Sequence, residues 1–321
     1  NFNVNSPVSS TSHPVPFHID PGERPPQIGQ NLYALGLIRS TIAWDLYTRG
    51  TNAGPKLQAG SFVLNTNMSL AQIVTTLQHG TSDQKVITFP EGFPLREQAK
   101  VVERKKIASA ADYLAAAKDP AWASTYTFLP QQPGNADAPF EGYLFPDTYL
   151  IDPAAGVRGL IKQQLDQFGV VFSDDLRAQI AQATPARPAQ TVRSIVIVAS
   201  MGDREANTST DRGNVCSVYY NRLKVNMTLG VDATLLYALG RLTPEPTYAE
   251  LSLNSPYNTR THAGLPPTPI SNPGRAAIRA CVNPPKTDFL FYFTDRQGVT
   301  HFETNQLDFD RDIQKYGTSG S

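Results

Sequence analysis

The residues with the clearest chemical potential lie at the end of an apolar segment near the middle of the chain. Residues 194–202 are all apolar or small, and they lead to the acid Glu205. In a helix, Ile195, Val198 and Gly202 share one face with Glu205, because side chains three or four positions apart lie on the same side. A carboxyl group on such an inward face loses water, which disfavours its charged form and raises its pKa. A raised pKa at Glu205 would suit a general acid at neutral pH.

A second acid, two residues earlier, fits a different helical face. Asp203 continues a stripe through Val192, Val196 and Ala199 that is as regular as the stripe of Glu205. Acids near helix ends are mostly solvated surface charges. Periodicity alone therefore favours a surface role for either acid.

The elements that must position Glu205 can be predicted from the spacing of apolar residues. The central helix is expected to start at about residue 190 and to end near Glu205. A second helix is expected to follow with Asp211 as its N-cap, and a third to begin at Asp232. Residues 289–294 and 299–305 alternate in character around a short polar turn, which predicts a β-hairpin.

Composition fits a folded protein of about two domains. The chain has 321 residues, of which 40% are hydrophobic and 17% charged. The formal net charge is zero and Lys and Arg form no run, so nucleic acid is not an expected partner. Cys216 and Cys281 show no metal-ligand spacing with any histidine, so no metal site is predicted. Whether the two cysteines pair is left open.

The N-terminal part of the chain suggests a tether followed by small modules. Residues 1–15 are rich in Ser, Asn and Pro without a period, which is typical of a flexible tether. A strand, a turn and a helix are expected within 17–38 and again within 86–104, as a weak internal repeat. The sequence has no run of the roughly 20 apolar residues that a membrane span requires.

Several motifs together resemble the endolytic murein transglycosylase family, the MltG/YceG-like proteins. They occur in the order found in the family, and the likeness extends from about residue 17 to about residue 310. The motifs are residues 141–149, 199–205, 220–223, 232–237 and 264–274.

This resemblance implies the fold and the domain boundaries. The fold would be α+β, with one or more small LysM-like α/β modules on the N-terminal side. A mostly helical, lysozyme-like catalytic domain with a closing β-hairpin would follow. The implied boundaries are 1–15 for the tether, 16–120 for the LysM-like module region, 121–316 for the YceG-like catalytic domain and 317–321 for a tail.

The resemblance also implies site residues. Glu205 matches the catalytic glutamate of the family. Packed aromatic residues, turn caps and solvated helix ends remain alternative interpretations of the other positions. Departures from the usual family residues occur at Gly202, Asp203, Gly230, Ala233 and Arg260. The candidate substrate-binding residues are Glu141, Tyr143, Asp147, Tyr149, Asn221, Arg222, Asp232, Thr234, Tyr257, Asn258, Ser271 and Asn272.

The implied activity is cleavage of the β-1,4 bond between N-acetylmuramic acid and N-acetylglucosamine within nascent glycan strands. The product would be a 1,6-anhydro end, formed without a metal or cofactor, because the sugar's own C6 hydroxyl is the nucleophile and one acid suffices. Two alternatives stay open. One is a hydrolytic muramidase that uses Glu205 with Asp232 or Asp147, and the other is a non-catalytic peptidoglycan-binding scaffold.

The resemblance further implies where and with what the protein works. Its partners would be peptidoglycan strands, together with peptidoglycan synthases or division proteins. The location would be the extracytoplasmic cell envelope. A segment upstream of residue 1 would anchor the protein in the cytoplasmic membrane.

Overall fold

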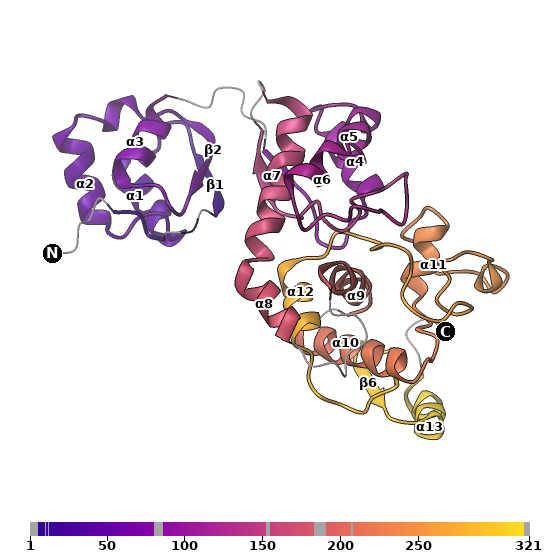
Figure 1. Ribbon diagram of the computed structural model, residues 1–321. Coiled ribbons are helices and arrows are strands. Elements are labelled where there is room, and N and C mark those ends of the chain that lie inside the picture. Colours follow the sequence, from indigo (N-terminus) through magenta and orange to yellow (C-terminus); the bar gives the residue numbers. More distant parts are fainter. Residues whose placement is uncertain are drawn as a thin grey trace. The chain divides into compact units, whose positions relative to one another are not determined.

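The structure divides the chain into two compact units. This computed structural model describes residues 6–9, 11, 13–79, 86–151, 155–182, 191–206 and 208–317. The first unit comprises Asn1–Thr88 and Thr148–Leu160, and the second comprises Phe89–Asp147 and Ile161–Ser321 (Figure 1). Part of the predicted tether, residues 1–5, 10 and 12, lies outside the described residues, as does the predicted tail after Gly317.

The first unit is a small antiparallel sheet covered by helices. Strand β1 pairs with β2 so that Phe17 lies opposite Phe62, and β1 starts three residues earlier than expected. Helix α3 begins with a reciprocal cap between Ser69 and Gln72, which satisfies two free backbone N–H groups. The elements are β1 (Pro14–Ile19), α1 (Pro25–Ala34), α2 (Thr41–Gly50), the 3-10 helix η1 (Gly54–Lys56), β2 (Gly60–Asn65) and α3 (Leu70–Gln78).

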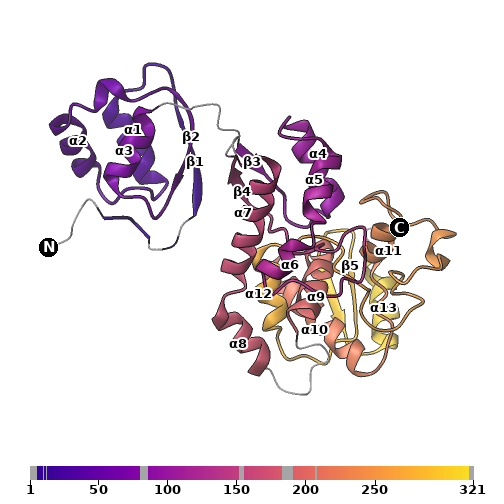
Figure 2. The same ribbon diagram turned by 45° about the horizontal axis from the view of Figure 1, so that its top comes forward.

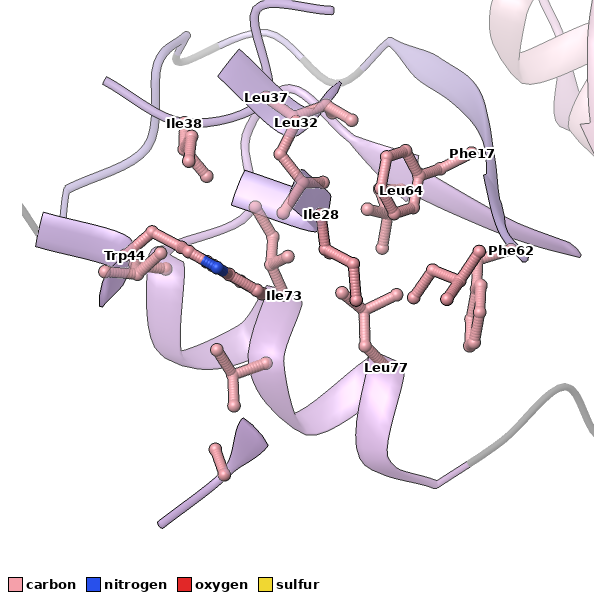
Figure 3. Close-up of a cluster of buried hydrophobic side chains, with 14 residues drawn as sticks. Phe17, Ile28, Leu32, Leu37, Ile38, Trp44, Phe62, Leu64, Ile73 and Leu77 are labelled. Atoms are coloured by element: carbon pink, nitrogen blue, oxygen red, sulfur yellow. The ribbon is translucent and has the colours of Figure 1, made fainter. Parts of the chain in front are cut away.

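The first unit has its own hydrophobic core. Side chains from β1, β2, α1, α2 and α3 form one buried cluster, which includes the fully buried Trp44 (Figure 3). The Trp44 indole packs over Gly29, where a β-carbon would lie 2.4 Å from the ring, so α1 and α2 can approach this closely only with glycine at that position. Trp44 Nε1 donates to the Pro25 carbonyl oxygen, so its polar atom is satisfied.

The expected repeat does not form a second module of this kind. Strand β3 (Val86–Thr88) pairs with β4 (Thr148–Leu150), about sixty residues further along the chain. Helix α4 (Leu95–Arg104) belongs to the second unit and packs its apolar face against α5 (Ala110–Ala117). The N-terminal segment of the first compact unit therefore ends at Thr88.

Helix α9 (Val192–Glu205) forms the centre of the second unit. In Figure 1 it is viewed nearly along its axis, with α10 (Ser209–Lys224) and α12 (Arg275–Val282) packed beside it. Figure 2 shows the same group from another direction, with α13 near the hairpin. The other elements are α6 (Ala121–Thr125), α7 (Gly156–Val171, which begins in the first unit), α8 (Asp174–Gln182), α11 (Asp232–Ala238), the 3-10 helix η2 (Glu250–Ser252), β5 (Phe291–Thr294), β6 (Thr300–Glu303) and α13 (Gln306–Tyr316).

Two sequence expectations in this unit are confirmed and one is wrong. The hairpin is present, with Tyr292 opposite Phe302, and α13 packs on it. Helix α9 ends at Glu205, as its pattern predicts. The N-cap of α10 is Thr208 and not Asp211. The Thr208 hydroxyl accepts the Asp211 backbone N–H, so the helix begins three residues earlier than expected.

Cys216 on α10 and Cys281 on α12 form a disulfide, which settles the pairing that the sequence left open. Both residues are fully buried beside α9. A β-carbon at Gly202 would lie 3.3 Å from Cys216 Sγ and 3.6 Å from Cys281 Sγ, so the absence of a side chain there makes room for the bridge. None of the described helices has the length and apolar character needed to cross a bilayer.

Candidate active site

The catalytic candidate Glu205 is the last residue of α9. Thr191 caps the start of the helix, and the segment from Ser194 to Gly202 is buried throughout. Ala206 is extended and stops the helix directly after the acid. The buried helix thus fixes the backbone of Glu205, whose side chain is partly exposed.

A cleft of about 800 Å³ opens beside Glu205. Its walls come from α9, α10, α11, the hairpin, α13 and the loops that follow α10 and α11. A volume of this size is typical of a ligand site rather than of a packing defect. The lining residues are Glu205, Arg222, Thr228, Leu229, Gly230, Asp232, Glu245, Pro246, Leu251, Arg260, Tyr292, Phe293, Thr294 and Phe309.

The surroundings of Glu205 favour its protonated form. Burial raises the pKa of Glu205 to about 6, and the negative charges of Asp232 and Glu245 act in the same direction. The Tyr292 hydroxyl donates to Glu205 Oε2 at 3.0 Å, and the Ala233 backbone N–H also donates to this carboxylate. These two hydrogen bonds lower the pKa and partly offset the burial. The group can therefore carry a proton near neutral pH and can also lose it.

Two arginines join Glu205 in the cleft. Arg260 pairs with Asp232 through Nη2 and Nε, at 2.6 and 2.7 Å from Oδ1. The Arg222 guanidinium donates to the carbonyl oxygens of Leu290 and Leu229, so it ties α10 to the hairpin and to the following loop. Of the candidate substrate-binding residues, Arg222 and Asp232 are the two that the structure places in the cleft with Glu205.

Asp203, the competing acid, lies apart from the cleft lining. Its Oδ1 is 3.2 Å from Arg212 Nε, and its Oδ2 accepts the Gly274 backbone N–H. Its side chain is almost fully buried, so it is neither the surface charge nor the cleft acid that the sequence left open. Asp203 joins α9 to the start of α12.

Several candidate substrate-binding residues are buried and bonded within the protein. Asn272 accepts the backbone N–H groups of Gly142 and Leu144. Asn258 donates to two carbonyl oxygens of the loop that contains Leu251, a cleft residue. In the same way, Thr234 bonds to Val231 and Thr259, Ser271 to Ser200, and the partly buried Asn221 to Thr287 and Phe289.

A separate hollow of about 500 Å³ contains two further candidates, Glu141 and Tyr257. Glu141 is buried and accepts the Leu95 backbone N–H at 2.9 Å and the Tyr237 hydroxyl at 3.1 Å. Burial raises the pKa of Glu141 to about 7. The Tyr257 ring lies against Tyr237, with ring centres 5.0 Å apart.

The three remaining candidates do not line either hollow. Tyr143 is buried against Phe168, and Asp147 accepts the Gln167 amide. Tyr149 is on β4 opposite Ile87 and belongs to the first unit. Both tyrosines of segment 141–149 are thus buried in the structure.

Among the cleft residues that the sequence did not indicate are Tyr292, Glu245 and Arg260. Tyr292 lies between two phenylalanine residues in its strand, a pattern that indicates packing. Its hydroxyl group was the one feature of the sequence that distinguished it from these neighbours. Alternation along β5 buries Phe291 and Phe293 more deeply than Tyr292, whose hydroxyl reaches Glu205.

Comparison with known proteins agrees with this architecture. Residues 17–315 match the model of the YceG-like family, so the chain belongs to that family. It is similar to a YceG-like protein of Listeria monocytogenes of known crystal structure, with 26% identity, a TM-score of 0.64, and coverage of 94% of this chain and 99% of the other.

Two relatives carry a functional name. The chain is 29% identical to the endolytic murein transglycosylase of Bacillus subtilis strain 168, over 95% of this chain and 85% of the relative. It is 28% identical to the endolytic murein transglycosylase of Streptococcus pneumoniae R6, also over 95% of this chain. The chain spans 59% of the length of that pneumococcal protein.

Proposed function

We propose that this chain is an endolytic lytic transglycosylase of peptidoglycan. It cleaves the bond between N-acetylmuramic acid and N-acetylglucosamine within a glycan strand and so limits strand length. The observation that carries this proposal is Glu205, a carboxyl group with a pKa raised to about 6 in a cleft large enough for sugar rings. The names of the relatives from Bacillus and Streptococcus support the choice of substrate.

The reaction needs one group that gives and then accepts a proton. Protonated Glu205 donates to the glycosidic oxygen as its bond to C1 of the muramic acid breaks. The Glu205 carboxylate then takes the proton of the C6 hydroxyl while that oxygen bonds to C1. The products are a 1,6-anhydro end and a free hydroxyl on the leaving sugar, and the enzyme returns to its starting form.

The arrangement around Asp232 favours this reaction over hydrolysis. A muramidase would use a second carboxylate to activate water or to attack C1. In the cleft, Oδ1 of Asp232 is bound by two nitrogens of Arg260, while Asp147, the other acid considered, is not part of the cleft lining. Asp232 then acts on Glu205 through its charge.

The other cleft residues bind the substrate, and residues around them support the cleft. Arg222 and Asp232 contact the glycan, while Thr234 and Asn258 hold the neighbouring cleft segments in place. Phe293 and Phe309 also line the cleft and add apolar surface beside a bound sugar.

The first unit is a LysM-like module in this proposal. Its small sheet covered by helices supports that role, in which it contacts peptidoglycan or sets the height of the catalytic unit. The protein works in the extracytoplasmic cell envelope, where its substrate is. An anchor in the cytoplasmic membrane and a partner among peptidoglycan synthases or division proteins complete the proposal.

Mass spectrometry of digested strands tests the activity. Purified peptidoglycan glycan is incubated with the protein and the new ends are identified by mass. Anhydro ends support the transglycosylase. Reducing ends would establish the muramidase instead, and intact strands that still bind the protein would establish the scaffold.

A further inference from the structure

We propose that Tyr292 and Tyr219 form a hydrogen-bonded pair that directs the acidic proton of Glu205 to its Oε1 atom. The proposal builds on the proposed function of Glu205 and adds two positioning residues. Tyr292 on β5 donates to Glu205 Oε2 at 3.0 Å. Tyr219 on α10 lies 3.1 Å from Tyr292, hydroxyl to hydroxyl.

The direction of these hydrogen bonds follows from counting protons. A phenol has one proton to donate, while an ionised carboxylate can only accept. With Glu205 ionised, Tyr292 must give its proton to Oε2. Tyr219 must then donate to Tyr292.

Protonation of Glu205 can place the proton on either carboxyl oxygen. With the proton on Oε1, Tyr292 still donates to Oε2 and both bonds are kept. With the proton on Oε2, one possibility is that Tyr292 donates to the hydroxyl oxygen of the acid, which is a weaker acceptor than its carbonyl oxygen. The other is that the chain reverses, so that Oε2 donates to Tyr292 and Tyr292 donates to Tyr219. In the reversed chain, the Tyr219 proton needs a new acceptor.

Tyr219 has no such acceptor within the part of the chain that the structure describes. Its side chain is fully buried, and its hydroxyl bonds to Tyr292. A buried donor without a partner is costly, because the lost hydrogen bond to water is not replaced. Both arrangements with the proton on Oε2 are therefore disfavoured, and the proton is held on Oε1, the oxygen that Tyr292 leaves uncovered.

Both phenols stay protonated in this environment. Burial raises the pKa of Tyr219 and Tyr292 well above the usual value for a phenol, and the charge of Glu205 adds to the effect. The pair therefore acts as a fixed donor and takes no part in the proton transfer itself.

Substitution of the two tyrosines tests the proposal. Tyr292→Phe keeps the ring and removes the donor, so kcat for strand cleavage should fall by about tenfold or more while KM changes little. Tyr219→Phe should reduce kcat in the same way but less. The double variant should reduce kcat no more than Tyr292→Phe alone, because the Tyr219 hydroxyl acts only through the Tyr292 hydroxyl.

A matched control is available on the same helix. Tyr220 is also buried and donates to the Cys281 carbonyl oxygen, away from Glu205. Tyr220→Phe should leave kcat unchanged. Circular dichroism and thermal melting of all variants establish that each is folded.

The pH profile provides a second readout. The charged residues that line the cleft with Glu205 are the same in every variant. They are Asp232 of α11, Glu245 of the loop after α11, Arg222 of α10 and Arg260. Loss of the Tyr292 donor destabilises the Glu205 carboxylate and so raises the pKa of Glu205. The alkaline limb of the pH profile of kcat should therefore move to higher pH.

The outcomes are decisive. A folded Tyr292→Phe protein with unchanged kcat and an unchanged alkaline limb overturns the proposal, as does a strictly additive double variant. Formation of anhydro ends by the unsubstituted protein tests the proposed function separately, so the two failures can be told apart.

Discussion

At the scale of single residues, burial decides what the carboxyl groups of the second unit can do. Glu205 and Glu141 both have raised pKa values, of about 6 and about 7, yet only Glu205 opens into the larger cleft. Glu141 accepts hydrogen bonds from a backbone N–H and two side chains inside the protein. The first acid therefore borders the larger cleft, whereas the second is held by hydrogen bonds within the protein.

The pH dependence of cleavage follows from Glu205. The active acid is the protonated form, and it is lost as the pH rises through about 6. We therefore expect kcat to decline above that pH, in a limb that reports one ionisation. Initial rates on purified strands between pH 4.5 and 8 provide the measurement; a kcat that keeps rising through this range would contradict the assignment.

Glu141 should make folding stability depend on pH. Its pKa is about 7 in the folded protein against the ordinary value of 4.5, so the folded state keeps a proton that the unfolded chain has released. The stability from this group is fully present below pH 4.5 and is lost as the pH rises to 7, by about 3 kcal/mol at most.

The substitution Glu141→Gln isolates this effect. Glutamine keeps the shape and is always neutral, so the variant should lose less stability than the parent between pH 4.5 and 7. Urea unfolding at both pH values measures the difference, with Glu205→Gln as the control for a second carboxyl group whose pKa is raised. If Glu141→Gln and the parent lost the same free energy of unfolding between pH 4.5 and 7, the Glu141 carboxyl would be excluded as the cause of the pH dependence.

At the scale of elements, the site is an assembly around one buried helix. Helix α9 carries Glu205, α10 supplies Arg222 and Tyr219, α11 begins with Asp232, and β5 contributes Tyr292. The disulfide between α10 and α12 ties together the two helices that flank α9. A covalent link at this place holds the scaffold of the site.

Removal of the disulfide should lower stability more than it alters chemistry. The bridge closes a loop of 65 residues, for which chain entropy predicts about 4 kcal/mol. The double variant Cys216→Ala, Cys281→Ala should unfold at lower urea concentration and retain most of its kcat well below the transition. A variant as stable as the parent would show that the bridge does not constrain the unfolded chain.

The sequence predicts these elements unevenly, for physical reasons. Helix α9 and the hairpin were predictable because the buried face of a helix and of a strand each repeats with a fixed period. The pairing of β3 with β4 was not, since it joins residues about sixty positions apart and no local pattern records it. For polar residues such as Asn258 and Asn272, residue type alone does not show that the structure gives them backbone partners.

At the scale of the whole molecule, the two compact units imply some independence in folding. Each has fully buried large side chains of its own, Leu32 in the first unit and Leu165 in the second. Substitution of a buried leucine by alanine typically lowers the free energy of unfolding by about 2–5 kcal/mol. Such a change should act mainly on the unit that contains it.

A pair of matched substitutions tests this independence. Leu32→Ala should lower one thermal transition and leave cleavage of short soluble glycan unchanged, whereas Leu165→Ala should lower the other transition. Differential scanning calorimetry and an activity assay at 25 °C are the measurements. A single transition that both variants lower equally would mean that the chain unfolds as one cooperative body.

The most direct test of the whole account is the substitution Glu205→Gln, which keeps the size of the side chain and removes its acid. Strand cleavage, followed by the mass of the anhydro ends, should fall by at least about a hundredfold, which is the lower range for loss of a general acid. Glycan binding and the melting temperature should stay near those of the parent. Cleavage by a folded Glu205→Gln protein at the parent's rate would contradict the account.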